Sequence, residues 1–447
     1  MKLKAIISAL LLSSVFIFSA GGCSITDFSA DNLLRPPKAM GDEAEIEQLI
    51  SETAKNGYTL KYPKNGNYRS AIIMADLNGD ENKEAIAFFR SNDDTTKIHM
   101  LVMYSDKNSW KLSSDNITEA TDIDSVDFAD IDGNETPEII VGYTTYTPNI
   151  NRLCCYSYSK EKISEIQSGH NYSSFYSGDF DNDGNSEIMS LLLFTAENEA
   201  SASMLDYSAD NNSLYAKAMV NMDPNVVKYK SVAASDFNDT TNGLIVDGSY
   251  ANRELNTQII YYSKELSILR NPLFKEKSKN ITQRSNSVSS YDVDNDGKIE
   301  IPVTSKLPHS ENQTEEIVAD KIVWNSFSDK NETLNPKINV ITNYDYNYYF
   351  KIQDKWGANS VTALINSTNR TTEFYEWKSD KPGKLLFEIK AFDLDDWNSG
   401  KSVNKYTLIS KNDKYAYAFK NINTDSPSSI SDDEIKTGFM AVTETTV

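Results

Sequence analysis

Short apolar and aromatic segments separated by turn residues make up most of this chain. Around residue 80, four such segments follow one another in the order YRSAIIMA, EAIAFF, KIHMLVMY and SWKLSS. The same order returns near residue 180, with SSFYSG, EIMSLLLF, ASMLDYS and LYAKAMV. Aliphatic, β-branched and aromatic runs bounded by Gly, Asn, Asp and Ser are typical of antiparallel strands. The pattern therefore predicts an all-β fold built from repeated four-stranded units.

Two short helices are expected at the ends of the strand-rich region. Between residues 43 and 55, isoleucine and leucine side chains share one face, and Asp42 and Glu45 suit a capping box at the start. Near the C-terminus, the segment SISDDEIKTGFMAV predicts a terminal helix.

One pattern of alternating Asp and Asn recurs along the chain. It places oxygen-bearing side chains at positions 1, 3, 5 and 9 of the loops DLNGDENKE, DIDGNETPE, DFDNDGNSE and DVDNDGKIE. The candidate metal ligands are Asp76, Asn78, Asp80 and Glu84; Asp130, Asp132, Asn134 and Glu138; Asp179, Asp181, Asp183 and Glu187; and Asp292, Asp294, Asp296 and Glu300.

The spacing of these oxygens suits Ca²⁺, which takes about six to eight oxygen ligands that a tight loop can aim inward. Gly184 and Gly297 at position 6 let the backbone turn without a Cβ clash. Asp, Asn and Gly also populate ordinary hairpin turns, but four matching copies favour Ca²⁺ binding. A fifth copy, DFNDTTNGL, keeps only Asp236 and Asn238, and we expect it to be a metal-free turn.

The interval between copies predicts the number of repeated units. The first residues of the five copies, at 76, 130, 179, 236 and 292, lie 49 to 57 residues apart, and weaker marks follow at Asp345 and Asp393. Seven units of this length predict a seven-bladed β-propeller, in which radial repetition protects the sheet edges. We therefore expect a propeller over 58–345, completed by two diverged blades over 346–447. The alternative is a separate small C-terminal domain over 346–447.

The N-terminus has the pattern of an export signal. Two lysines precede an apolar run that is too short to span a bilayer comfortably. The sequence AGGC, ending at Cys23, resembles the lipobox of bacterial lipoproteins, although Ala20 replaces the usual leucine. That resemblance implies that 1–22 is a signal peptide, that Cys23 is lipidated, and that 23–57 is a membrane-anchored tether with a short helix. The alternative is an ordinary cleaved signal that releases a soluble protein.

The charge of the chain argues against nucleic acid as a partner. There are 44 Lys and Arg against 65 Asp and Glu, for a formal net charge of −21, so clustered basic residues that neutralise phosphates are lacking. Cys154 and Cys155 are adjacent in a predicted strand and should point to opposite faces, which indicates no disulfide framework.

Known catalytic motifs are missing from the sequence, including HExxH, GxSxG and the Walker phosphate loop. The three histidines, His99, His170 and His309, are isolated from one another. Tyrosines and tryptophans such as Tyr344 and Trp356 could stack on a sugar, although such residues more often fill a strand-rich core. We expect no catalytic residue.

At the four loops the sequence resembles the FG-GAP and VCBS repeat families. Their Asp-x-Asp-x-Asp-Gly-x-x-Glu loops bind Ca²⁺ in the propeller head of integrin α subunits and in many bacterial surface proteins. The likeness covers about residues 58–305, and the VCBS type is the closer one because neither an FG pair nor a GAP triplet flanks the loops. The resemblance implies largely structural metals that brace a hairpin within a blade, and it implies no particular activity.

Together these features predict a cell-surface lipoprotein on the extracytoplasmic face of the membrane. Its calcium-braced propeller would act as a binding or scaffolding module for a protein or glycan ligand. The alternative function is a polysaccharide-active enzyme on the same scaffold, since propellers host both kinds of activity.

Overall fold

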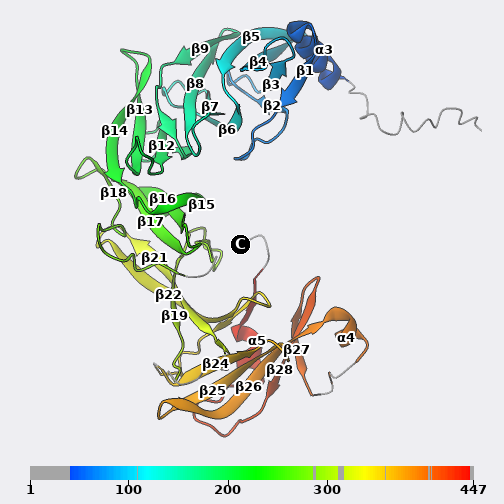
Figure 1. Ribbon diagram of the computed structural model, residues 1–447, viewed down its shortest axis with the longest axis vertical. Helices are drawn as coiled ribbons and strands as arrows, with labels where there is room; N and C mark the ends of the chain where they lie inside the picture. Colours follow the sequence, from blue (N-terminus) through cyan, green and yellow to red (C-terminus); the bar gives the residue numbers. More distant parts are fainter. Residues whose placement is uncertain are drawn as a thin grey trace, which may run out of the picture.

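The structure is a computed structural model that describes residues 41–107, 109–284, 288–310, 317–357, 359–400, 403 and 405–442. These residues form six antiparallel sheets and three short helices, which confirms the all-β class. The sheets follow one another in chain order along an open arc (Figure 1). The predicted signal peptide and Cys23 lie outside the described residues.

Each of the first three sheets contains one copy of the acidic loop. The first contains β1 (Tyr58–Lys61), β2 (Ile72–Ala75), β3 (Glu84–Ser91), β4 (Lys97–Asp106) and β5 (Ser109–Glu119). The second contains β6 (Asp122–Ala129), β7 (Glu138–Thr144), β8 (Asn151–Ser159), β9 (Lys162–Ile166) and β10 (Asn171–Tyr172). The third contains β11 (Ser174–Gly178), β12 (Glu187–Leu192), β13 (Ser201–Ser208) and β14 (Ser213–Asn221).

The last three sheets are formed by the strands from β15 onward. The fourth contains β15 (Val226–Asn238), β16 (Thr241–Tyr250), β17 (Leu255–Ser263) and β18 (Ile268–Arg270). The fifth contains β19 (Ile301–Lys306), β21 (Asp320–Ser328), β22 (Thr333–Asn343), β23 (Tyr348–Lys351) and β29 (Phe439–Ala441). The sixth contains β20 (Ile317–Val318), β24 (Val361–Asn366), β25 (Thr371–Lys378), β26 (Lys381–Asp393), β27 (Thr407–Lys411) and β28 (Tyr415–Asn421).

The described residues form six sheets, whereas the repeat interval predicted seven blades. Where two diverged blades were expected, strand β26 pairs with β28 and unites the segment in one six-stranded sheet, while β29 adds to β23 of the fifth sheet. The two weak repeat marks misled the count: Asp345 lies in the turn between β22 and β23, and Asp393 stands at the N-cap position of α4 (Leu394–Asn398). Aspartate is common in turns and at helix starts without any repeat.

Five apolar clusters of the core each join two consecutive sheets. Cys154 of β8 packs in the cluster between the first and second sheets, whereas Cys155 packs in the cluster between the second and third. The prediction that the two thiols point to opposite faces is therefore confirmed. Further clusters join the third sheet to the fourth, the fourth to the fifth and the fifth to the sixth.

Helices cover the outer faces at both ends of the arc. Helix α3 (Asp42–Ala54) confirms the predicted N-terminal helix and buries Ile46 and Ile50 against the first sheet. The expected capping box does not form, because Gly41 is the N-cap and Glu45 instead accepts a hydrogen bond from the backbone N–H of Trp110. Helix α4 packs on β26 and β28 of the sixth sheet (Figure 1).

The predicted terminal helix is confirmed as α5 (Asp432–Gly438). Ser431 and Glu434 form a capping box at its start. Within the described residues, no helix has both the length and the apolar character needed to cross a membrane.

Candidate functional site

The four acidic loops occupy equivalent places in their sheets. The first three connect the edge strands β2, β6 and β11 to the neighbouring strands β3, β7 and β12, and the closing glutamate is the first residue of the second strand. The fourth loop ends at Glu300, directly before β19, where a bridge pairs Glu300 with Tyr291. The first three loops are therefore hairpin turns between strands, as the sequence predicts, whereas the fourth lies between the two residues of an isolated bridge.

One hydrogen bond fixes the closing glutamate in every loop. Its Oε2 accepts the backbone N–H of loop position 2, so the carboxylate is held against the turn. These bonds come from Leu77 (2.8 Å), Ile131 (2.8 Å), Phe180 (2.8 Å) and Val293 (3.0 Å). All four glutamates are buried.

The four backbones share two left-handed residues, at loop positions 4 and 6. The first two loops place Gly79 and Gly133 at position 4, and position 6 is Glu81 (φ 67°) or Glu135 (φ 69°). The last two loops place an asparagine at position 4 and a glycine at position 6. The turn is kept because the first aspartate accepts the backbone N–H of position 6 in every loop. Glycine is therefore not required at position 6.

Three of the loops bring carboxylate oxygens close enough to share one cation. In each of these loops, every carboxylate of the group offers one oxygen, and these oxygens all lie within 4.8 Å of one another. The groups are Asp130, Asp132 and Glu138; Asp179, Asp181, Asp183 and Glu187; and Asp292, Asp294 and Glu300. Ligands on opposite sides of Ca²⁺ lie roughly 4.6 to 5.2 Å apart, twice the usual Ca–O distance. The donor set of these loops therefore fits a calcium ion.

The first loop fits a cation less well. The amide nitrogen of Asn78 faces Oε1 of Glu84 at 3.2 Å and Oδ2 of Asp80 at 3.3 Å, while its oxygen accepts the backbone N–H of Asp80. In the second loop, the oxygen of Asn134 accepts from Thr136. At both asparagines, the amide oxygen already takes part in the turn.

Burial raises the pKa of the closing glutamates, to about 7 for Glu138 and about 8 for Glu187. The pKa values of Glu84 and Glu300 are raised for the same reason. A buried carboxylate without a cation is costly to ionise, and a divalent ion beside it would stabilise the charged form.

The third loop contains one buried carboxylate oxygen that is not hydrogen-bonded by the described residues. Glu187 is fully buried, and its Oε1 has no hydrogen-bond partner among the described residues. Buried acceptors are nearly always paired, because leaving one unpaired costs about 1–3 kcal/mol. A cation held by the third loop would satisfy this oxygen.

Neighbouring loops touch one another in a row. A Cβ added to Gly133 of the second loop would lie 2.5 Å from Oδ1 of Asn185 in the third. Asn182 of the third loop donates to the carbonyl of Thr240 in the fifth copy, which forms the tight turn between β15 and β16. The loops thus contribute to the contacts between consecutive sheets.

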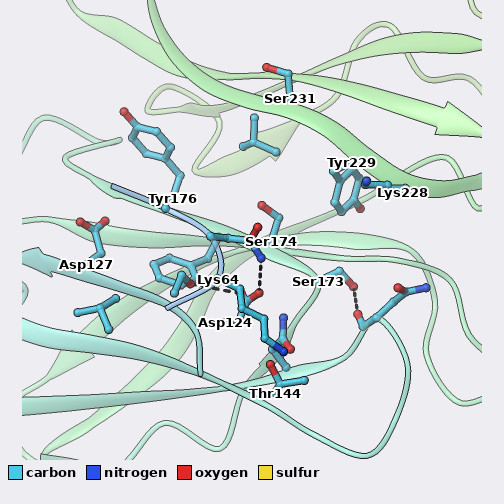
Figure 2. A pocket seen from close by; sticks show the side chains of 18 of the residues that line it. Lys64, Asp124, Asp127, Thr144, Ser173, Ser174, Tyr176, Lys228, Tyr229 and Ser231 are labelled. Atoms are coloured by element: carbon cyan, nitrogen blue, oxygen red, sulfur yellow. Dashed lines mark hydrogen bonds between the residues drawn. The ribbon is translucent and has the colours of Figure 1, made fainter. Parts of the chain in front are cut away.

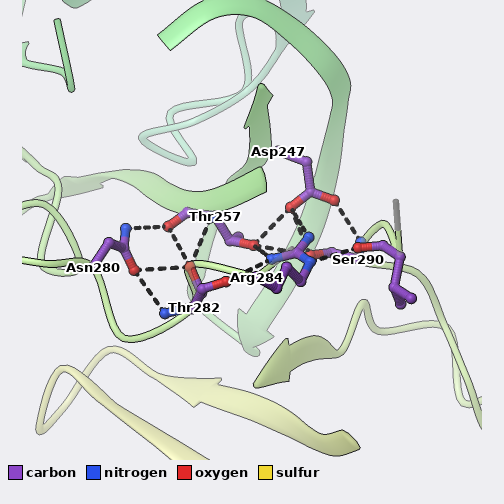
Figure 3. A network of polar contacts seen from close by, with 7 residues as sticks. Asp247, Thr257, Asn280, Thr282, Arg284 and Ser290 are labelled. Carbon is purple, nitrogen blue, oxygen red and sulfur yellow. Dashed lines mark hydrogen bonds and ion pairs between the residues drawn. The ribbon is translucent and has the colours of Figure 1, made fainter. Parts of the chain in front are cut away.

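A buried ion pair holds the segment that leads into the fourth loop. Arg284 pairs with Asp247 of β16 at 3.0 Å and donates from Nε to the carbonyl of Val288, and Asp247 also accepts the backbone N–H of Ser290 (Figure 3). Ser290 lies two residues before Asp292. The network therefore sets the place from which the fourth loop starts.

A polar cavity of about 950 Å³ lies where the edge strands β6, β11 and β15 meet. The side chains of Lys64, Asp124, Asp127, Tyr176 and Tyr229 are among those that surround it (Figure 2). Its size is near the upper end of the range of ligand pockets. Its residues were not predicted from sequence, because they come from three sheets that meet only after folding.

The two aspartates of this cavity are held by neighbouring groups. Asp124 accepts hydrogen bonds from Asn65 (2.8 Å) and the hydroxyl of Tyr172 (2.7 Å), and Asp127 accepts from Ser177 (2.5 Å). None of the three histidines lines the cavity. Fixed carboxylates and hydroxyls of this kind suit the recognition of a polar ligand.

No model of a known protein family matches this chain, and no curated protein matches it. The similarity to FG-GAP and VCBS repeats therefore stays a prediction from the sequence.

Solved structures show only loose likeness. A protein from Lactobacillus plantarum matches at 8% identity over 70% of this chain and 82% of its own, with a TM-score of 0.30. A candidate 6-phosphogluconolactonase from Bacteroides uniformis matches at 13% identity over 73% and 93%, with a TM-score of 0.33. Sqt1 of Saccharomyces cerevisiae matches at 7% identity over 76% and 93%, with a TM-score of 0.29. These scores are too low to carry an argument about this chain.

Proposed function

We propose that this protein is a lipid-anchored binding module on the extracytoplasmic face of the cell membrane, with a β-sheet array braced by Ca²⁺. Cys23 would carry the lipid, and the acidic loops would hold the metal. The observation that carries the proposal is the third loop, where four carboxylates converge and the buried Oε1 of Glu187 has no hydrogen-bond partner among the described residues. The similarity of the four loops to calcium-binding repeats supports it.

Calcium would stabilise the folded protein and would not take part in a reaction. An ion that binds the folded loops better than the unfolded chain stabilises the fold by mass action. Because consecutive loops touch, a bound ion would brace the junction between sheets as well as its own hairpin. We expect affinities of about 0.1 to 1 mM, typical of extracellular modules.

The test of calcium binding is the melting temperature of the full chain in Ca²⁺ and in chelator. We expect the melting temperature to rise with millimolar Ca²⁺ and to fall with chelator, with Mg²⁺ as the matched control ion. An unchanged melting temperature in all three conditions would rule out calcium bracing.

The cavity between β6, β11 and β15 is the proposed binding surface, and a glycan is the ligand class it suits best. Tyr176 exposes 38% of its surface there, and an exposed aromatic ring can stack on the apolar face of a sugar. Asp127, Lys64 and several serines would hydrogen-bond sugar hydroxyls. Binding is favoured over catalysis because both cavity aspartates are held by neighbouring groups.

A glycan array and a pull-down from the native envelope test this surface. Tyr176→Ala should abolish capture of the bound glycan, whereas Tyr146→Ala removes an exposed tyrosine outside the cavity and should leave capture unchanged. Equal capture by both variants would place the ligand elsewhere.

For the anchor, Cys23→Ala should release the protein from the membrane fraction, and retention of that variant there would contradict lipidation at Cys23.

A further inference from the structure

A lysine projects from the same structural position beside the third and fourth loops. In the third sheet, Met204 pairs with Ala218 and Leu205 with Ala216, so Lys217 of β14 is the unpaired residue of a β-bulge. In the fifth sheet, the corresponding shift leaves Lys337 of β22 unpaired, between Pro336 and Ile338. A bulge re-aims the side chain of its extra residue. In both sheets the re-aimed side chain reaches the acidic loop.

The ammonium of Lys337 lies inside the set of carboxylates that the fourth loop would offer a metal. Its Nζ is 2.9 Å from Asp294, 2.6 Å from Asp296 and 3.0 Å from Oε1 of Glu300. Glu300 is fully buried, so this contact pairs the oxygen that would otherwise face the loop interior alone. Burial works against the charge of Lys337, but the three carboxylates outweigh it and raise the pKa of the lysine.

Lys217 forms an ion pair with only one carboxylate of the third loop. Its Nζ contacts Asp181 at 2.5 Å but also Asp206, outside the loop, at 2.8 Å. Oε1 of Glu187 stays without a hydrogen-bond partner in the described part of the chain. The third loop therefore keeps an unsatisfied ligand atom, whereas in the fourth loop the matching oxygen is paired.

The first two loops differ again. Among the described residues, no lysine or arginine forms an ion pair with the carboxylates of these loops. In the first sheet, the bulge residue of β5 is Ser113, which donates instead to the carbonyl of Glu161.

We propose that Lys337 is a built-in counter-cation of the fourth loop, which Ca²⁺ must displace in order to bind there. An ammonium group donates three hydrogen bonds and can close the loop without metal, at the cost of a lower calcium affinity. This proposal rests on the calcium binding proposed above. Of the three loops whose carboxylates could share one cation, the fourth would accordingly depend least on Ca²⁺ for its folded shape.

The test compares Lys337→Met with Lys330→Met in the full chain. Lys330 is an exposed lysine in the turn between β21 and β22, so the control removes the same charge from the same hairpin. Calcium titration calorimetry should show one site that binds on the order of tenfold more tightly in K337M, with no change in K330M. In chelator, K337M should melt below K330M, because Glu300 loses its only cationic partner in the described residues.

Two further variants keep the test decisive. Lys337→Gln retains a hydrogen-bond donor and should fold where K337M does not, with the same gain in affinity. The double variant D292N K337M should lose that gain, which assigns the improved site to the fourth loop.

The outcomes separate this inference from the proposed function. If the wild type binds Ca²⁺ and K337M and K337Q bind it with unchanged affinity, the competition by Lys337 is disproved and the calcium proposal survives. If neither the wild type nor any variant binds Ca²⁺, both proposals fail.

Discussion

Nη2 of Arg284 lies 3.0 Å from Oδ1 of Asp247, and both side chains are fully buried. The pair ties the long connection between β18 and β19 to the middle of β16, because Arg284 also donates to the carbonyls of Thr282 and Val288. Every contact lies upstream of the fourth loop, so the ion pair positions that loop without taking part in it.

Removing the arginine should destabilise the protein strongly. Arg284→Met leaves Asp247 buried without its counter-charge, and we expect a loss of about 3–5 kcal/mol of unfolding free energy. The matched control is Arg270→Met, which breaks an ion pair with Glu332 that is about one-third exposed and should cost less than about 1 kcal/mol. Urea unfolding measures the free energy of unfolding of both variants. Equal losses would show that the buried ion pair contributes no more to stability than the exposed one.

Substitutions in single loops should separate metal ligands from turn residues. Asp179→Asn in the third loop keeps the shape of the side chain but removes a charge that faces the proposed cation, so the rise in melting temperature with Ca²⁺ should shrink. Asp236→Asn makes the same change in the fifth copy, where we expect no metal, and the rise should stay as in the wild type. A smaller rise in D236N than in D179N would reverse the assignment.

The contact between the second and third loops should be sensitive to one added carbon. Gly133 has φ +75°, and a Cβ there would crowd Asn185, so Gly133→Ala combines backbone strain with a clash. Gly169→Ala carries the strain alone, since Gly169 has φ +61° and open space around it, and should cost roughly 1–2 kcal/mol. Thermal melts should show a larger loss for G133A, and Asn185→Ala should restore part of it. If Asn185→Ala restores none of the stability lost in G133A, the clash with Asn185 is not the cause of the extra loss.

Helix α5 should contribute less stability as acid neutralises its capping box. The backbone N–H of Ser431, helped by Lys355 and the Ser431 side chain, lowers the pKa of Glu434 to about 2. A lowered pKa stabilises the fold above the unfolded-state value near 4.5, and this contribution is lost as the pH falls from there towards 2. Wild type and Glu434→Gln should therefore differ slightly at pH 6, by less than about 1 kcal/mol, and converge only as the pH approaches 2. A gap that widens in acid would contradict this sign.

Local features of the fold were predictable because they depend on short stretches of chain. The alternation of strands and turns fixed the all-β class, and position 9 of each loop marked a buried glutamate that opens or directly precedes a strand. The orientation of the Asn78 amide, whose nitrogen faces Glu84, could not be predicted from its place in the loop. An asparagine offers either a donor or an acceptor, and the surrounding backbone decides which one.

Features that depend on how sheets meet could not be predicted. The bulge that aims Lys337 into the fourth loop arises from the register between β21 and β22, which a pattern of residue types does not define. The sixth sheet escaped prediction for the same reason, because β26 pairs with β28 across the α4 segment. The cavity around Tyr176 needs three sheets in place before it exists.

The covered ends of the arc have a consequence for the evolution of its length. Five apolar clusters each join two consecutive sheets, and α3 and α4 pack on the two outer faces. Such an array behaves as a row of coupled modules, in which a module can be gained or lost between equivalent points without redesigning the rest. A deletion that fuses the second loop to the third at Asp130 and Asp179 would remove one complete module. The chain would then be one of several lengths that the same architecture can support, in contrast to a ring, whose closure permits few.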